Sequence, residues 1–331
     1  MGGYLQRMKT LLRPKAVLPG DLVAIAGLSA PMFDDDRLLR RGIGVLEGMG
    51  LRVRVAPLVE TQTRRWWSAG TAQQIADELN TLLRDPQVRA IIAHTGGNTV
   101  ASYLDLIDLD AVRADPKPIL GYSDISLLNL FLHGQTGLVG FHADLATHGM
   151  GGDWFDVLDA ARRDELAALY LRVLAGEAPI ALPPGGDWEC WRPGRARGRL
   201  LGGLLNRIVR LQATPYALPA GAFDGAVLFW EEVRRPLEWV WNDLHLLRLS
   251  GVLDRIAAMA VGVPQQVSTE YPDPPTLREV VLDVVGDRDL PVLGQVDFGH
   301  RSTNLLLPVG VTAELDATGR ALTLLESATV R

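Results

Sequence analysis

One cysteine, Cys190, occurs among the 331 residues. A single thiol excludes a disulfide within the chain and argues against a metal site built on cysteines. Cys190 lies in the stretch DWECW, away from any expected helix start. We therefore interpret it as a packing residue rather than a reactive thiol.

Long apolar runs are missing as well. No stretch approaches the roughly 20 apolar residues of a membrane span. Residues 1–21 hold neither the apolar core nor the cleavage site of a secretory signal. We therefore expect a cytoplasmic protein that does not act at a membrane.

An excess of positive charge is also absent. The formal net charge is −6, which argues against binding a nucleic-acid polymer or an anionic membrane. The exception is the cluster RPGRARGR, from Arg192 to Arg199. We interpret this cluster as a solvated loop between strands.

Two cofactor motifs are lacking. The first expected strand runs into AGLSAP instead of the G-x-G-x-x-G of dinucleotide-binding folds. No histidine falls in the H-E-x-x-H pattern of helical zinc sites. We therefore expect no metal and no organic cofactor.

Segments typical of strands and helices alternate through the first half of the chain. Expected strands cover residues 21–29, 51–57, 88–97 and 117–123, and expected helices cover 34–50, 69–85 and 124–137. Such alternation predicts an α/β fold with a parallel sheet covered by helices. Sites in these sheets form at the carboxyl ends of the strands.

The composition changes near residue 151. We expect an N-terminal domain at 1–150, a helix and linker at 151–190, and a smaller strand-rich α/β domain at 191–331. Short strands and turns are expected in most of this last part, 198–216 included. The chain closes with a β-hairpin whose turn is DATGR.

Two strand ends in the first half carry candidate site residues. One holds Gly96, Gly97 and Asn98, and the other holds Ser123 and Asp124. A serine between a strand and a helix has the geometry of a nucleophile elbow. The same position also suits a serine that caps the helix, and the local pattern leaves both interpretations open.

A nucleophilic serine needs a base and a group that orients the base. Glu231 and Glu232 follow a buried strand, where one can orient an imidazole or form a surface salt bridge with Arg234 or Arg235. His300 lies at the tip of a glycine turn. It is a candidate base, and the alternative is a structural histidine.

Five segments together resemble the serine peptidases that include the LD-carboxypeptidases and the microcin C immunity hydrolases. They are PGDLVAIAGLSAP, IIAHTGGNTVASYLDLIDLDAVRADPKPILGYSDISLL, GRARGRLLGGLLNRIVRLQATPY, GAVLFWEEV and VDFGHRSTNLLLPVG. The resemblance extends from about Pro19 to Leu325. Ordered motifs at similar spacing are more specific than any single one.

The resemblance implies a catalytic triad of Ser123, Glu231 and His300. It implies an oxyanion hole made by the backbone N–H groups of Gly97, or Gly96, and of Asp124. It also implies a Rossmann-like or flavodoxin-like N-terminal domain, a smaller strand-rich C-terminal domain and a homodimer.

The chain departs from the family pattern at three places. Leu204 replaces the asparagine of G-G-N-L, Ala213 replaces a common glycine before Thr214, and HTGGN replaces the R-G-G-Y-G of the LD-carboxypeptidase branch. The departure in the glycine loop favours the microcin immunity branch. Candidate substrate-binding residues are Gly96, Asn98, Trp188 and Trp191, and the alternative for the two tryptophans is interdomain packing.

We therefore predict a serine hydrolase that cleaves an amide bond in a peptidyl nucleotide of the microcin C type or a related small peptide conjugate. One alternative is an LD-carboxypeptidase that trims the terminal D-amino acid of peptidoglycan tetrapeptides. Another is a non-catalytic small-molecule binding protein on the same fold.

Overall fold

The computed structural model describes residues 10–32, 36–300 and 304–331. Residues 1–9, part of the N-terminal segment in which we expect no secretory signal, lie outside the described part. No helix within these ranges is both long enough and apolar enough to span a membrane.

The first half of the chain builds a parallel sheet. Its strands are β1 (Leu22–Ala26), β2 (Arg52–Val55), β3 (Val88–Ala93), β4 (Ile119–Leu120) and β5 (Phe141–His142). They lie in the order β5-β4-β3-β1-β2, and each adjacent pair is parallel. The predicted α/β arrangement with a parallel sheet is confirmed.

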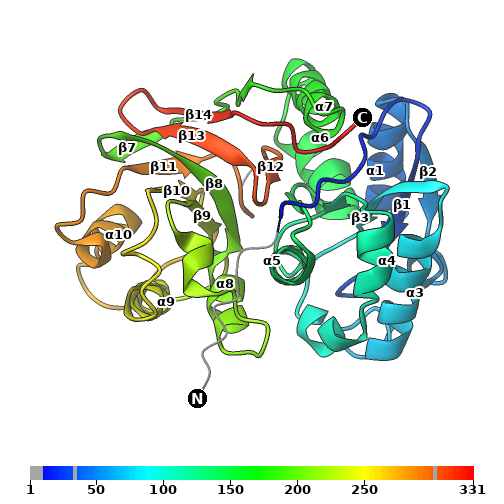
Figure 1. The fold of residues 1–331 in the computed structure, drawn as a ribbon, viewed down its shortest axis with the longest axis horizontal. Helices are drawn as coiled ribbons and strands as arrows, with labels where there is room; N and C mark the ends of the chain where they lie inside the picture. Colours follow the sequence, from blue (N-terminus) through cyan, green and yellow to red (C-terminus); the bar gives the residue numbers. More distant parts are fainter. Residues whose placement is uncertain (1–9, 33–35, 301–303) are drawn as a thin grey trace.

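Helices surround this sheet in the right half of Figure 1. They are α1 (Asp36–Gly48), α2 (Pro57–Glu60), α3 (Ala72–Arg84), α4 (Leu109–Ala114) and α5 (Ile125–Thr136), with 3₁₀ turns at Val100–Ser102 and Leu104–Leu106. A capping box opens α3, because Thr71 and Gln74 exchange side-chain to backbone hydrogen bonds. Helix α5 is buried along most of its length and lies between the two halves of the molecule.

The second half builds a mixed sheet. Its strands are β6 (Ile180–Ala181), β7 (Glu189–Arg192), β8 (Arg195–Leu204), β9 (Val227–Glu231), β10 (Ala258–Gly262), β11 (Val292–Val296), β13 (Thr312–Asp316) and β14 (Ala321–Leu324). Strands β8, β9, β10 and β11 form a parallel centre. The outer strands are antiparallel, and β13 and β14 form the expected hairpin.

Further helices connect the sheets and cover the second one. They are a π-helix at Ala146–Asp153, α6 (Trp154–Asp156), α7 (Ala160–Leu174), α8 (Leu205–Gln212), a 3₁₀ turn at Ala220–Phe223, α9 (Leu237–Leu249) and α10 (Leu277–Val285). Helix α8 corrects the expectation of short strands and turns throughout 198–216. It forms because Leu205, Ile208 and Leu211 recur at helical spacing and are buried together.

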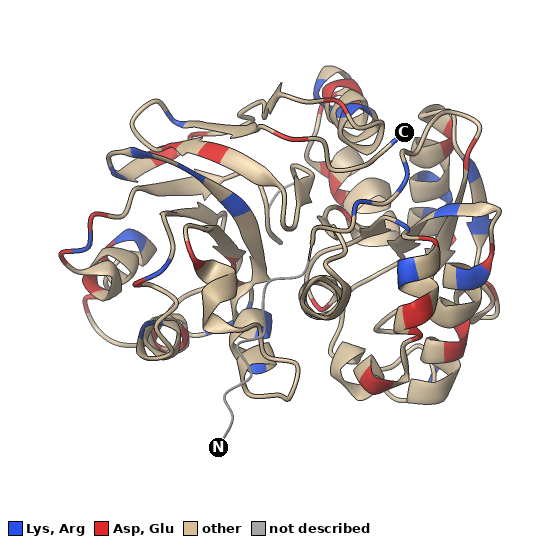
Figure 2. Ribbon diagram, viewed as in Figure 1, with Lys and Arg blue, Asp and Glu red and all other residues tan. Residues whose placement is uncertain are grey.

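The arginine cluster is not the solvated loop that the sequence suggested. Its arginines lie in β7 and β8, on either side of Pro193 and Gly194, and alternate side chains of a strand share one face of the sheet. Arg195 and Arg197 pair with Asp316 and Glu314 of the adjacent strand β13. In Figure 2 the basic positions along the β8 ribbon are blue and lie beside acidic positions of β13, which are red.

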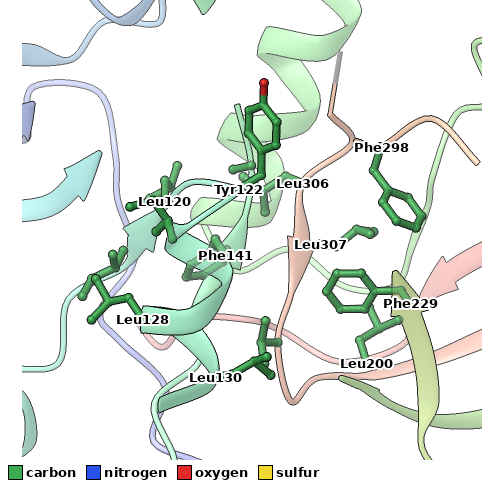
Figure 3. Close-up of a cluster of buried hydrophobic side chains, with 14 of the residues drawn as sticks. Leu120, Tyr122, Leu128, Leu130, Phe141, Leu200, Phe229, Phe298, Leu306 and Leu307 are labelled. Carbon is green, nitrogen blue, oxygen red and sulfur yellow. The ribbon is translucent and has the colours of Figure 1, made fainter. Parts of the chain in front are cut away.

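The two halves of the chain are interlocked. Strand β12 (Leu307–Pro308), from the second half, pairs antiparallel with β5 at the edge of the first sheet. One continuous apolar core joins the sheets. Figure 3 shows it between the two halves, with Leu120 and Phe141 on one side and Phe229 and Phe298 on the other.

Candidate active site

The carboxyl end of β4 delivers Ser123. The strand ends at Leu120, and α5 begins at Ile125. Ser123 is half-buried and has a φ of 62°, a left-handed conformation that non-glycine residues seldom adopt. The residue at the helix cap position is Asp124, and it makes no side-chain capping bond. The strained turn favours the nucleophile-elbow interpretation of Ser123.

The Asp124 side chain fixes the turn that carries Ser123. Its carboxylate is buried and accepts hydrogen bonds from the Ser29 hydroxyl at 2.6 Å and the Thr99 N–H at 2.6 Å. It also accepts from the Val100 N–H at 2.9 Å and pairs with Arg207 Nε at 2.8 Å. The Asp124 side chain therefore holds the turn that carries Ser123 against the glycine loop. The backbone N–H is the group of Asp124 that can donate to a substrate oxygen.

The carboxyl ends of β9 and β11 deliver the other two candidates for the triad. Glu231 is the last residue of β9, and His300 follows β11 at the end of a turn. His300 Nδ1 lies 2.8 Å from Glu231 Oε2, with the glutamate fully buried and the histidine partly exposed. The edge of the His300 ring faces Tyr122, with the ring centroids 4.7 Å apart. The bond between His300 Nδ1 and Glu231 fixes the orientation of the imidazole and leaves Nε2 available to act as a base.

A buried polar network supports the turn that carries His300. Gly299 has a φ of 118°, and a Cβ atom there would lie 3.0 Å from the Glu231 Cβ. Asn304 Oδ1 accepts from the Gly299 N–H at 2.8 Å, and its Nδ2 donates to Asp144 at 2.7 Å. His142 Nε2 donates to the same Asn304 oxygen at 3.0 Å. Buried hydrogen bonds to Asn304 therefore hold the turn in place.

A cavity of about 550 Å³ brings the candidates together. Ser123 and His300 both line it, with Gly96, Gly97 and Asn98 on the glycine loop that follows β3. A Cβ atom on Gly96 would lie 2.8 Å from the Ser123 hydroxyl, so this loop passes directly beside the serine. The cavity has the size of a small-molecule site.

Four arginines give the cavity a positive character. Arg207 and Arg210 come from α8, and Arg234 and Arg235 follow β9. The carboxylate of Asp153, which also lines the cavity, has its pKa raised to about 7 by burial and by the nearby Asp144 and Asp156. Such a site suits a substrate that carries negative charge.

Glu232 has a structural place next to the candidate acid. Its buried carboxylate accepts two hydrogen bonds from the Asn206 side chain, at 2.7 and 2.9 Å, and one from the Val233 N–H at 3.0 Å. Burial, and to a smaller extent the charge of Glu231, raises the pKa of Glu232 to about 7. Glu232 thus positions α8 against β9.

The two candidate tryptophans do not reach the cavity. Trp188 and Trp191 are both buried. The indole N–H of Trp188 donates to Asp297 at 2.8 Å, and that of Trp191 donates to Glu189 at 2.6 Å. The structure therefore places both in the packing of the second sheet, beside β7 and β11, and not among the residues that line the cavity.

Sequence reasoning missed the contribution of α8. Asn206 and Arg207 directly follow a buried apolar segment, as Glu231 and Glu232 do. This pattern of polar residues after a buried strand could have indicated that they belong to the site. Arg210 had no signal of its own. Within the described ranges, no group of three or more His, Cys, Asp or Glu residues is arranged to hold a metal.

Comparison with known proteins identifies the family. The LD-carboxypeptidase N-terminal domain matches residues 23–143, and the LD-carboxypeptidase C-terminal domain matches residues 197–315. The chain belongs to the LD-carboxypeptidase family of serine peptidases. This confirms the resemblance seen in the sequence, and membership makes the protein a carboxypeptidase-like hydrolase.

Relatives of this LD-carboxypeptidase family member span its whole length. A putative carboxypeptidase of Streptomyces coelicolor is 33% identical over 319 residues, which cover 96% of this chain and 97% of the relative. The microcin C7 self-immunity protein MccF of Escherichia coli is 26% identical over 97% of each chain. A solved structure of MccF with glutamyl sulfamoyl guanosine has a TM-score of 0.85 at 22% identity, covering 96% of this chain and 99% of that one. The last likeness confirms the two-part fold.

Proposed function

We propose that this protein is a serine hydrolase that cleaves an amide bond in a peptidyl nucleotide of the microcin C type or in a related small peptide conjugate. The observation that carries the proposal is the 2.8 Å bond between His300 and buried Glu231 at a cavity that Ser123 also lines. Similarity to MccF over 97% of both chains supports the substrate class.

In the proposed reaction, His300 Nε2 accepts the proton of the Ser123 hydroxyl while the Ser123 oxygen attacks the amide carbonyl. The backbone N–H groups of Gly97 and Asp124 stabilise the negative oxygen of the tetrahedral intermediate. His300 then gives its proton to the leaving amine as the C–N bond breaks. Water, activated by His300, hydrolyses the acyl-enzyme, and Glu231 stabilises the imidazolium in both steps.

An LD-carboxypeptidase acting on peptidoglycan tetrapeptides is the second candidate. It is favoured by the two LD-carboxypeptidase domain matches and by the arginines that line the cavity, which suit a peptide carboxylate. The glycine loop HTGGN, which lacks an arginine, favours the first candidate. As part of the same proposal, the protein acts in the cytoplasm as a homodimer.

The test is turnover of two substrates by the purified protein, aspartyl sulfamoyl adenosine and an LD-linked peptidoglycan tetrapeptide, with products identified by mass spectrometry. We expect release of aspartate from the first. Ser123→Ala should lower kcat by about 10⁶-fold with the fold intact, whereas Ser102→Ala, at an exposed serine, should not.

Cleavage of the tetrapeptide alone would assign the protein to the second candidate. A protein that hydrolyses neither substrate and does not react with a fluorophosphonate is a binding protein on the same fold.

A further inference from the structure

A second cavity adjoins the one that Ser123 lines. It has a volume of about 340 Å³, and the two cavities share Asn98, Arg207 and Arg210 as lining residues. A group bound at Ser123 can therefore extend past these three side chains into the second cavity. Of the residues assigned above to the reaction, Asp124 alone lines this space, and its carboxylate is already bonded to the protein.

One side of the second cavity is apolar. Ala101, Leu104, Leu127, Pro215 and Tyr216 line it. The Tyr216 ring stands edge-on to Phe131, with the centroids 4.9 Å apart, so it is held in place by the core. This side suits an apolar group or a ring, and the charged residues at the boundary suit an anion.

Arg207, at the boundary between the cavities, is fully engaged by the protein. Its Nε pairs with Asp124, and its Nη1 donates to Asn206 at 2.6 Å. Its Nη2 donates to the Gly97 carbonyl at 3.0 Å and to Asn98 at 2.6 Å. Arg207 therefore organises the glycine loop and has little left to offer a substrate.

Arg234 and Arg235 also have protein partners. Arg234 Nε donates to Gln266 at 3.2 Å. Arg235 lies 3.3 Å from Asp243 and over the Trp239 ring. Both line the first cavity, and neither lines the second.

Arg210 differs from these three arginines. It comes one turn after Arg207 on α8, and within the part of the chain that the structure describes it forms no hydrogen bond or ion pair. Asp105 lines the same cavity and does not pair with it. Burial, followed by repulsion from Arg207 and Arg235, lowers the pKa of Arg210, and the weaker attraction of Asp124 and Asp243 opposes this shift. Figure 2 marks basic positions along the α8 ribbon in blue.

We propose that Arg210 binds a carboxylate of the substrate next to the scissile amide, and that the second cavity receives the apolar part of the same substrate. Arg210 lines both cavities and has no hydrogen-bond partner among the described residues, so its guanidinium is available to pair with an incoming anion. This inference rests on the proposed hydrolase and assigns its specificity to α8.

The experiment measures binding to the Ser123→Ala protein by calorimetry, so no turnover is needed. Two pairs of ligands are compared: aspartyl sulfamoyl adenosine with its asparaginyl counterpart, and the peptidoglycan tetrapeptide with its C-terminal amide. When Arg210→Ala is added to the Ser123→Ala protein, the affinity for the carboxylate ligand of one pair should fall about tenfold. The affinity for the matching neutral amide ligand should fall less than about twofold. The affected pair identifies the source of the carboxylate.

Two further variants sharpen the result. Ala101→Trp, which fills the second cavity, should weaken both members of the same pair. Arg278→Ala, at an exposed arginine on α10, should change neither. Equal loss for carboxylate and amide on Arg210→Ala, or no loss in either pair, overturns the proposal. The hydrolase proposal fails separately, if wild-type protein turns over none of the four compounds.

Discussion

At the scale of single residues, the site depends on close contact between the glycine loop and the nucleophile. Gly96 and Ser123 come from neighbouring parallel strands, whose carboxyl ends meet at one edge of the sheet. No side chain fits between them, because even a Cβ on Gly96 would lie 2.8 Å from both side-chain atoms of Ser123. Glycine at this position is therefore required for the loop and Ser123 to lie as close together as they do.

Gly96→Ala should reduce kcat/KM by about 100-fold, since the added methyl displaces the serine from its working position. Thermal unfolding should change little by comparison. Gly44→Ala is the matched control, because a Cβ there has no atom within 4 Å. A Gly96→Ala protein with wild-type kcat/KM would show that the loop moves away freely.

At the scale of elements, α5, α8 and the glycine loop are tied together through one carboxylate. Asp124 lies at the start of α5, Arg207 on α8 and Thr99 after the glycine loop. The ion pair between Asp124 and Arg207 is buried on both sides. Removal of either partner leaves the other charge desolvated and unpaired.

Asp124→Ala should lower the free energy of unfolding by about 3–5 kcal/mol, measured by urea denaturation. Asp110→Ala provides the comparison, because its pair with Arg113 is exposed and should cost less than about 1 kcal/mol. Similar losses from the two substitutions would mean that the buried pair contributes no more than a surface one.

The elements also show what sequence can and cannot reveal. Polar residues after buried strands and at a glycine turn predict Ser123, Glu231 and His300 as site residues, and the structure places Ser123 and His300 at one cavity with Glu231 bonded to His300. The burial of Trp188 and Trp191 could not be predicted from the sequence, because it depends on which strands become neighbours in the sheet. The same holds for Asn304, whose partners Asp144 and His142 lie about 160 residues away. The arginine cluster was misinterpreted because its acidic partners lie on β13, far along the chain.

At the scale of the whole molecule, several carboxylates are buried near the cavity, and they link stability to pH. The pKa of Asp153 is raised from 3.8 to about 7, first by burial and then by the nearby Asp144 and Asp156. A raised pKa means that the folded state binds its proton more tightly than the unfolded state does. The stability associated with this proton is complete below pH 4 and is lost as the pH rises to about 7.

Asp153→Asn should therefore become more stable relative to wild type as the pH rises from about 4 to 7. Urea denaturation at several pH values measures this difference. Glu279→Gln should not reproduce it, because hydrogen bonds from Thr276 lower the pKa of Glu279 and reverse the sign. A constant difference between Asp153→Asn and wild type would contradict the raised pKa.

The pairing of β12 with β5 affects the order in which the parts of the protein can fold during synthesis. During synthesis the chain leaves the ribosome from its N-terminus, and early domains generally fold first. Here one side of β5 stays unpaired until Leu307 and Pro308 have emerged, because they pair with the side of β5 that faces away from β4. The first sheet, begun by Leu22, is thus among the last parts to be finished. A ribosome that stalls before residue 307 carries a nucleophile segment on an incomplete sheet.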